Sequence, residues 1–146
     1  DLDAGAVTAK CLSDALGGVH DRGWVHHIPR LMVLGNHALQ QGYDPDELTR
    51  WYTANFVDGY EWVMPVNVVG MSQHADGGKM ATKPYSSGGA YINKMSDHCA
   101  DCAYDPKKRL GDSVVAMSPA PPPSLAARWG WFSPPVLSSC LLSIHS

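Results

Sequence analysis

The composition of the chain changes abruptly at Ser113, and this change limits how much of the chain can form a packed fold. Residues 1–112 carry nearly all of the charge, whereas residues 113–146 contain six prolines and one charged residue. Proline removes a backbone donor and clashes with the preceding turn, so the second segment cannot propagate a helix. We therefore expect one folded domain over 1–112 and an irregular Pro- and Ser-rich tail over 113–146.

Length and charge exclude several classes of protein. A chain of 146 residues, 45% of them hydrophobic, can bury a real core, which argues against wholesale disorder. The formal net charge of -3 excludes a nucleic-acid binder that works by bulk positive charge alone. There is no apolar run of roughly 20 residues and no signal-peptide pattern. We expect a cytoplasmic protein with no membrane contact and no obligate protein partner.

Hydrophobic periodicity predicts an all-α fold. Apolar residues recur at helical spacing over 24–39, Gly42 suits the end of that helix, and Pro29 either kinks it or marks its first turn. A second helix begins at Asp44-Pro45 with a cap, a first-turn proline and acids, and is expected to continue through Val57.

The stretch that follows has fewer helix signals. Residues 63–90 are rich in Gly, Pro, Asn and Ser, which predicts a long ordered loop. A short helix over 93–98, starting near 86–89, is expected to deliver Cys99. No period-2 hairpin pattern is present, so no strand is predicted.

The cysteines are the first chemical signal. Cys99 and Cys102 form a C-x-x-C pair, Cys11 lies far upstream, and Cys140 lies in the tail. Thiolates two residues apart can hold one metal centre. Spacing alone leaves zinc (with His98 as a further ligand), an iron–sulfur cluster, redox thiols and inert cysteines as alternatives.

Two histidines and an ion pair are the next candidates. His26 and His27 are adjacent, so on a helix they project about 100° apart and cannot form a same-face metal pair. One of them facing a pocket would suit proton transfer, although two ordinary helix histidines is the simpler interpretation. Arg30 shares a face with His27, and Asp58, expected on the next helix, can pair with Arg30 beside a cofactor or as a surface ion pair.

Aromatic residues are frequent in the same part of the chain. They are core residues by default, and they can also relay single electrons or stack on an extruded base. Spacing does not choose between these roles for Trp51, Tyr52, Trp62, Tyr85 and Tyr91.

Over residues 11–112 the sequence resembles one family nearly continuously. The matching text is WVHHIPRLMVLGNHALQQGYDP, WYTANFVDGYEW, GMSQHADGG and TKPYSSGGAYINKMSDHCADCAYDPKKRLGD. It is similar to the iron–sulfur bacterial cryptochromes and photolyases, also called prokaryotic (6-4) photolyases. The resemblance implies the C-terminal part of their helical FAD-binding domain.

The resemblance also implies cofactors. Cys11, Cys99 and Cys102 correspond to three ligands of a [4Fe-4S] cluster, and FAD is the second cofactor. The family's fourth cysteine follows the Gly-Asp of KRLGD, where this chain has no cysteine, and Cys140 does not match in spacing. We interpret the text from Ser113 onward as the product of a frameshift or a misjoined reading of the gene.

Roles for individual residues follow from the same resemblance. His27, with His26 beside it, matches the histidine that donates a proton to the lesion, and Met64 stands where an acidic or amide residue usually faces the flavin. The remaining matches are Arg30, Asp58 and Asn67 toward FAD, Trp51, Tyr52 and Tyr91 in electron transfer, and Tyr85 and Lys83 toward the lesion and DNA.

The implied activity is light-driven repair of UV-damaged DNA, in which reduced FAD passes an electron to a (6-4) pyrimidine lesion. Three alternatives stay open at this point: a cryptochrome-like photoreceptor without repair, a small zinc module, and an inactive fragment. Repair under blue light and the visible spectrum separate them, because a receptor gives no turnover and zinc is colourless.

Overall fold

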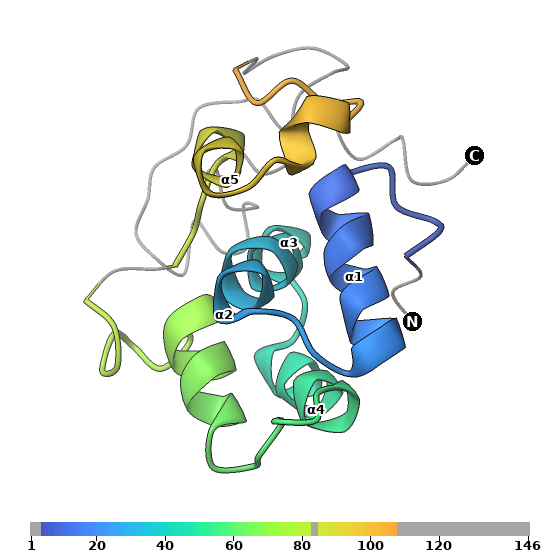
Figure 1. Cartoon of the computed structure of the whole chain (residues 1–146). Coiled ribbons are helices and arrows are strands. Elements are labelled where there is room, and N and C mark those ends of the chain that lie inside the picture. The colour runs from blue at the N-terminus through green and yellow to red at the C-terminus, as the bar shows by residue number, and fades with distance from the viewer. Residues whose placement is uncertain (1–3, 83–84, 108–146) are drawn as a thin grey trace.

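The computed structural model describes residues 4–82 and 85–107 (Figure 1). The predicted irregular tail and Lys83 lie outside these residues. The described part of the chain consists of helices and loops and contains no β-strand, which confirms the all-α fold. The elements are α1 (Lys10–Arg22), α2 (His27–Pro29), η1 (Arg30–Gly35), α3 (Asn36–Gln41), α4 (Pro45–Asn55), η2 (Val66–Ser72), α5 (Gly89–Met95) and η3 (His98–Asp101).

One helical run, made of α2, η1 and α3, passes through the middle of the molecule. Figure 1 shows α1 beside it, α4 and the green η2 segment below it, and α5 with the orange η3 segment above it. The run starts with His26 as its cap and Pro29 in its first turn, and it ends at Gly42, whose φ of 72° is left-handed. The predicted helix is therefore confirmed from His27 onward, whereas Trp24 lies before its start, and η1 is wound as a π-helix.

Helix α4 begins as predicted and ends earlier than predicted. Asp44 accepts hydrogen bonds from the amides of Asp46 and Glu47 at 2.9 and 3.0 Å. The helix ends at Asn55, so the expectation that it continues through Val57 is wrong. Gly59 closes the chain onto the helix end, where a Cβ would lie 2.7–2.9 Å from three carbonyl oxygens, and only glycine fits there.

The predicted loop over 63–90 is wrong in one part, because η2 occupies Val66–Ser72. Its β-branched residues and Gly70 favour helix weakly, so the segment depends on packing for its conformation. It packs against η1 where a Cβ on Gly35 would lie 2.1 Å from the Ser72 hydroxyl oxygen. The Gln73 side chain also donates to the Gly35 carbonyl at 2.9 Å.

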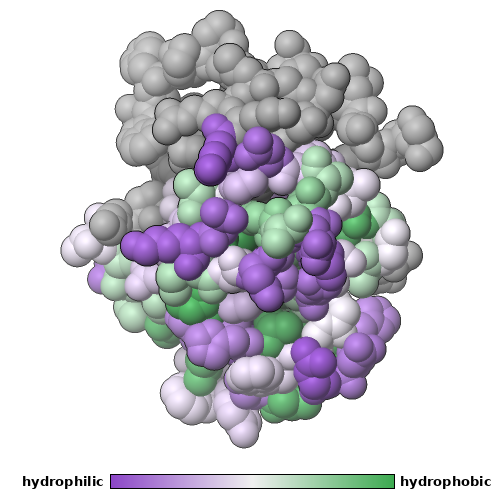
Figure 2. Space-filling view, turned by 45° about the horizontal axis from the view of Figure 1, so that its top comes forward, coloured by the Kyte–Doolittle hydropathy of each residue, from purple (hydrophilic) through white to green (hydrophobic). Residues whose placement is uncertain are grey.

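A single core lies between these helices. Its most buried members include Leu16, Tyr52, Met64 and Val68, each at most 2% exposed. On the face shown in Figure 2, apolar residues are scattered among hydrophilic ones. Within 4–82 and 85–107, no helix combines the length and apolarity that crossing a bilayer requires.

Candidate functional site

The Arg30–Asp58 pair is formed. The Arg30 Nη2 atom donates to Asp58 Oδ1 at 2.9 Å, to Oδ2 at 3.0 Å and to the Val25 carbonyl at 3.2 Å. Asp58 lies on the turn after α4 and not on a helix as expected, because the chain leaves the helix at Phe56. The Val57 amide donates to the Gly23 carbonyl at the end of α1, which holds that turn beside Arg30.

Aromatic residues support the guanidinium from the side of α4. The Arg30 Cζ atom lies 4.2 Å from the centroid of the Phe56 ring, and that ring stacks on Tyr52 at 5.1 Å. The Tyr52 hydroxyl donates to the Arg30 carbonyl at 2.7 Å. Tyr52 is fully buried, and burial raises the pKa of its phenol well above the usual range. The Trp51 ring lies 5.3 Å from the Tyr52 ring.

The pair keeps unused hydrogen-bonding capacity toward a ligand. Arg30 is 5% exposed, and its Nε atom is buried without a hydrogen-bond partner among the described residues. The Asp58 side chain is 42% exposed. A buried donor without a partner costs free energy, so a group with an acceptor atom against Arg30 would be stabilised. This chemistry fits an anionic ring such as that of a flavin.

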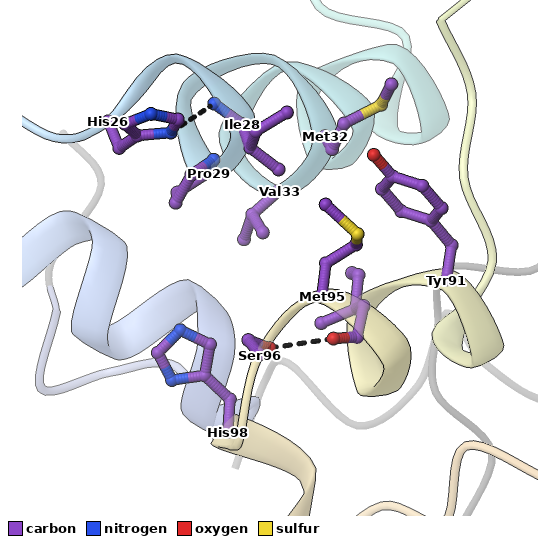
Figure 3. Close-up of a pocket in the computed structure, with 10 residues that line it drawn as sticks. His26, Ile28, Pro29, Met32, Val33, Tyr91, Met95, Ser96 and His98 are labelled. Carbon is purple, nitrogen blue, oxygen red and sulfur yellow. Dashed lines mark hydrogen bonds between the residues drawn. The ribbon is translucent and has the colours of Figure 1, made fainter.

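The two predicted histidines play different parts. His26 caps α2 by accepting from the Ile28 amide at 3.2 Å, and its ring lines a cavity of about 320 Å³ (Figure 3). His27 is exposed and does not line that cavity. Partial burial, followed by the charges of Arg30 and His26, lowers the pKa of His27.

The cavity lies between the central helical run and α5. Figure 3 shows Met32 from the run and Met95 from α5 on either side of it, with the Tyr91 hydroxyl turned toward Met32. His98 lies at its far end. The structure thus brings His26 and Tyr91 to one cavity, whereas Trp51 and Tyr52 belong to the other side of the central helices.

Three segments bring the predicted cysteines together. Cys11 comes from the first turn of α1, Cys99 from η3, and Cys102 from the residue after η3. All three line one small pocket with His98, Tyr104 and two apolar residues, Ala9 and Ile92. None of the three forms a disulfide.

Burial and the neighbouring cysteines favour the protonated thiol form in this pocket. Burial, followed by the charges of Cys102 and Cys99, raises the pKa of Cys11 to about 11. Burial, and then Cys102, also raises the pKa of Cys99. No three His, Cys, Asp or Glu side chains among residues 4–82 and 85–107 are placed to hold a single metal ion. The described structure therefore shows no preformed metal site at these thiols, although all three line the same small pocket.

Sequence reasoning missed the polar chain behind this pocket. His98 Nδ1 lies 2.9 Å from Asp14 Oδ2, and Lys10 pairs with the other oxygen of Asp14. Burial alone would raise the pKa of Asp14, but the hydrogen bonds from Lys10 and His98 lower it. The available signal was spacing, since Asp14 follows Cys11 by three residues on one helix and His98 directly precedes Cys99.

Other predicted residues are spread over the surface and the core. Asn67 is half-buried and donates to the Val63 carbonyl at 3.0 Å within its own helical turn. Tyr85 is half-buried, and Met64 is fully buried in the core. Trp62 is 78% exposed and stacks on Tyr60 with ring centroids 6.2 Å apart.

Comparison with known proteins supports the resemblance to the photolyase/cryptochrome family. No family model matches the sequence. The chain is 50% identical over 110 residues to a (6-4) photolyase of Agrobacterium fabrum, which supports its being a fragment of a protein of this family. It is also 43% identical over 54 residues to an uncharacterised protein of Acanthamoeba polyphaga mimivirus. These matches cover 75% and 37% of the chain, and 22% and 44% of the respective relatives. The chain thus spans less than half the length of either protein.

Proposed function

We propose that this chain forms part of the flavin-binding module of a light-dependent DNA repair protein that splits (6-4) pyrimidine photoproducts. The observation that carries the proposal is the ion pair between the buried Arg30 and the partly exposed Asp58, in which the Arg30 Nε atom has no acceptor among the described residues. Its setting in a sequence 50% identical to a (6-4) photolyase supports the same function. The substrate is UV-damaged DNA.

The pair would hold and orient the flavin ring. FAD, when bound, supplies the photoexcited electron that opens the lesion. Arg30 stabilises negative charge on the ring, and Asp58 fixes the guanidinium by accepting two hydrogen bonds from one of its nitrogens. Trp51 and Tyr52 lie in ring contact and would carry single electrons toward the ring.

His27 would manage the proton at the lesion. Partial burial and the charge of Arg30 lower its pKa, which favours the neutral ring in the chain. An anionic phosphate or lesion brought against the ring would raise that pKa and load the ring with a proton to donate. Tyr85 and exposed lysines, Lys79 and Lys94, would face the DNA.

The cysteine pocket would hold the iron–sulfur cluster. Cys11, Cys99 and Cys102 line one pocket and supply the thiolates that iron prefers. The cluster, when bound, supplies iron charge that lets buried thiols with raised pKa values ionise. The residues around it exclude water by burial of Cys11 and Ile92.

A chimera tests the repair function. Residues 11–112 of this chain would replace the matching segment of the Agrobacterium (6-4) photolyase, and the purified protein would be assayed for bound FAD and for blue-light repair of an oligonucleotide carrying one (6-4) lesion. We expect FAD to be retained and light-dependent repair to occur. Arg30→Met should reduce FAD content at least tenfold, whereas Arg50→Met, an exposed arginine of α4, should not.

The outcomes of this assay separate the alternatives. Flavin photoreduction without repair would overturn the repair proposal and favour a photoreceptor. A folded chimera that retains no FAD would overturn the assignment of the Arg30–Asp58 pair to the flavin. Dark controls and the parent enzyme set the limits of the assay.

A further inference from the structure

Two consecutive residues of the central helical run hold two later segments of the chain. The Gly35 carbonyl accepts from Gln73 Nε2 at 2.9 Å, which ties the end of η2 to the run. Asn36 Nδ2 donates to the Ser87 carbonyl at 2.7 Å, which ties the segment before α5 to the same place. The boundary between η1 and α3 is therefore a polar junction inside the molecule.

The contact between Asn36 and Ser87 is enclosed on all sides. Asn36 is fully buried, and Ser87 is 6% exposed. The Ser87 hydroxyl also donates to the Met32 carbonyl at 3.1 Å, so Ser87 is attached to the central run at two points. Buried hydrogen bonds of this kind fix one arrangement of the chain, because a shift leaves polar groups without partners.

Residues 85–88 depend on these two bonds for their place. They form no helix or strand. Among the described residues, their other hydrogen bonds are those from the Tyr91 and Ile92 amides to the Gly88 carbonyl, which begin α5. The two bonds at Ser87 are thus the hydrogen bonds that join this described segment to the central run.

The segment and α5 carry two of the predicted functional residues. Tyr85, which is predicted to face the lesion, lies two residues before Ser87, and Tyr91 lies four residues after it. Figure 3 shows the Tyr91 hydroxyl turned toward Met32, the residue whose carbonyl accepts from Ser87. The placement of both tyrosines against the central run therefore depends on the contacts of Ser87.

The amide of Asn36 is not an optimal packing group. Its Oδ1 atom is buried without a hydrogen-bond partner among the described residues. A buried acceptor without a partner costs free energy. An apolar side chain of the same size would remove that cost and lose the bond to Ser87, so what the amide supplies at this position is the donor.

We propose that Asn36 is a positioning residue of the repair site, and that it acts through Ser87 to hold Tyr85 and Tyr91 where the lesion binds. The inference rests on the proposed function and goes further by naming two buried residues, outside the flavin and cysteine sites, on which lesion binding depends. The flavin is affected little, because the guanidinium of Arg30 is held from the α4 side by the Phe56 ring.

The test uses the chimera described under the proposed function. The dissociation constant for an oligonucleotide with one (6-4) lesion is measured in the dark by fluorescence anisotropy. KM, kcat, FAD content and the rate of flavin photoreduction are measured on the same preparation. Asn36→Leu keeps the size of the side chain and removes the donor. We expect it to weaken dark binding and raise KM about tenfold, while kcat, FAD content and photoreduction change by less than about twofold.

Asn36→Asp gives a readout that depends on the donor itself. A neutral carboxyl group can donate its proton to the Ser87 carbonyl, whereas a carboxylate repels that oxygen. Burial raises the pKa of a carboxyl group, so the neutral form persists to higher pH than usual. The ratio of the KM of this variant to that of the unsubstituted chimera should be close to one at low pH and should rise as the pH passes the raised pKa.

Ser87→Ala is the mildest variant, because it removes one hydroxyl and keeps the carbonyl that Asn36 holds. It should raise KM about threefold. Combined with Asn36→Leu it should add little, since both changes act on the same segment. Asn55→Leu is the matched control and should change nothing, because Asn55 is exposed and donates within α4 to the Trp51 carbonyl at 2.8 Å.

Two results would overturn this inference and leave the proposed function standing. The first is unchanged dark binding and unchanged KM in Asn36→Leu and Ser87→Ala. The second is a parallel loss of FAD, photoreduction and lesion binding in Ser87→Ala, which would make the contact a requirement of the whole fold. An unsubstituted chimera that retains FAD and repairs no lesion would instead overturn the proposed function, and this inference with it.

Discussion

The Arg30–Asp58 region and the cysteine pocket differ in where their partners come from. Arg30 finds a carboxylate, a carbonyl and an aromatic face within the chain, and its buried Nε atom has no acceptor among the described residues. The three cysteines face one another, and burial raises the pKa values of Cys11 and Cys99. The first region therefore stabilises the fold by itself, whereas the second is a donor set that is stabilised only when a group binds to it.

The largest expected effect on stability comes from replacing Arg30. Arg30→Ala deletes three hydrogen bonds and the contact with the Phe56 ring, and should lower the free energy of unfolding by about 3 kcal/mol. The value lies at the low end for a buried pair because Asp58 is 42% exposed and regains water. Urea unfolding followed by circular dichroism measures it. Arg50→Ala is the control, and a loss below about 1 kcal/mol for Arg30→Ala would contradict the comparison.

Disturbing the packing between η1 and η2 is expected to give a smaller loss of stability. Gly35→Ala places a Cβ 2.1 Å from the Ser72 hydroxyl oxygen, so η1 and η2 must separate, at a cost of about 2 kcal/mol. Ser72→Ala in the same chain removes that oxygen and should recover most of the loss. A double-mutant cycle in urea measures the coupling, and simple additivity of the two changes would show that the helices do not meet there.

Part of this architecture could be predicted from the sequence because its signals are local. Asp44-Pro45 and Gly42 act through their own turns, so the start of α4 and the end of α3 were predicted correctly. The η2 helix could not be predicted, because its valines and Gly70 favour helix weakly and the segment packs against both η1 and α4, which lie earlier in the chain. The end of α4 was missed for a similar reason, since Gly59 closes it by packing on carbonyls.

The two candidate sites could also be predicted only in part. The resemblance predicted Arg30, Asp58 and the three cysteines. The structure pairs Arg30 with Asp58 and brings the three cysteines to one pocket. The positions of Asp14 and His98 behind the cysteines needed the fold, because 84 residues separate the two. The roles of His27, Asn67, Tyr85 and Tyr91 stay predictions, since side-chain geometry alone does not test a reaction.

The cysteine pocket should respond weakly in stability and strongly in binding. Cys11→Ser replaces a buried thiol by a hydroxyl with less tolerance for burial, and should cost about 1 kcal/mol in the metal-free chain. The same change should abolish iron uptake. Unfolding curves and iron content measured on one preparation check both, with Cys140→Ser as control. A stability loss as large as that of Arg30→Ala would mean that the pocket is a structural core and not a binding site.

The smallest expected effect is a difference in pH dependence between α3 and the segments around the cysteine pocket. Burial lowers the pKa of His37, on α3, below its ordinary value of 6.5, so the unfolded chain binds the proton more tightly and stability falls as the pH drops below about 6.5. The pKa of Asp14 is lowered from 3.8, so its contribution persists above that value and is lost only as the pH falls further. Hydrogen exchange, corrected for the intrinsic pH dependence, should therefore show α3 weakening near pH 5 to 6 while α1 and η3 stay protected to about pH 4.

His37→Gln should remove most of the pH dependence of protection in α3 and leave that of α1 and η3 unchanged. Simultaneous loss of protection in both regions would mean that they unfold as one cooperative unit, and the difference between them would then be one of binding alone.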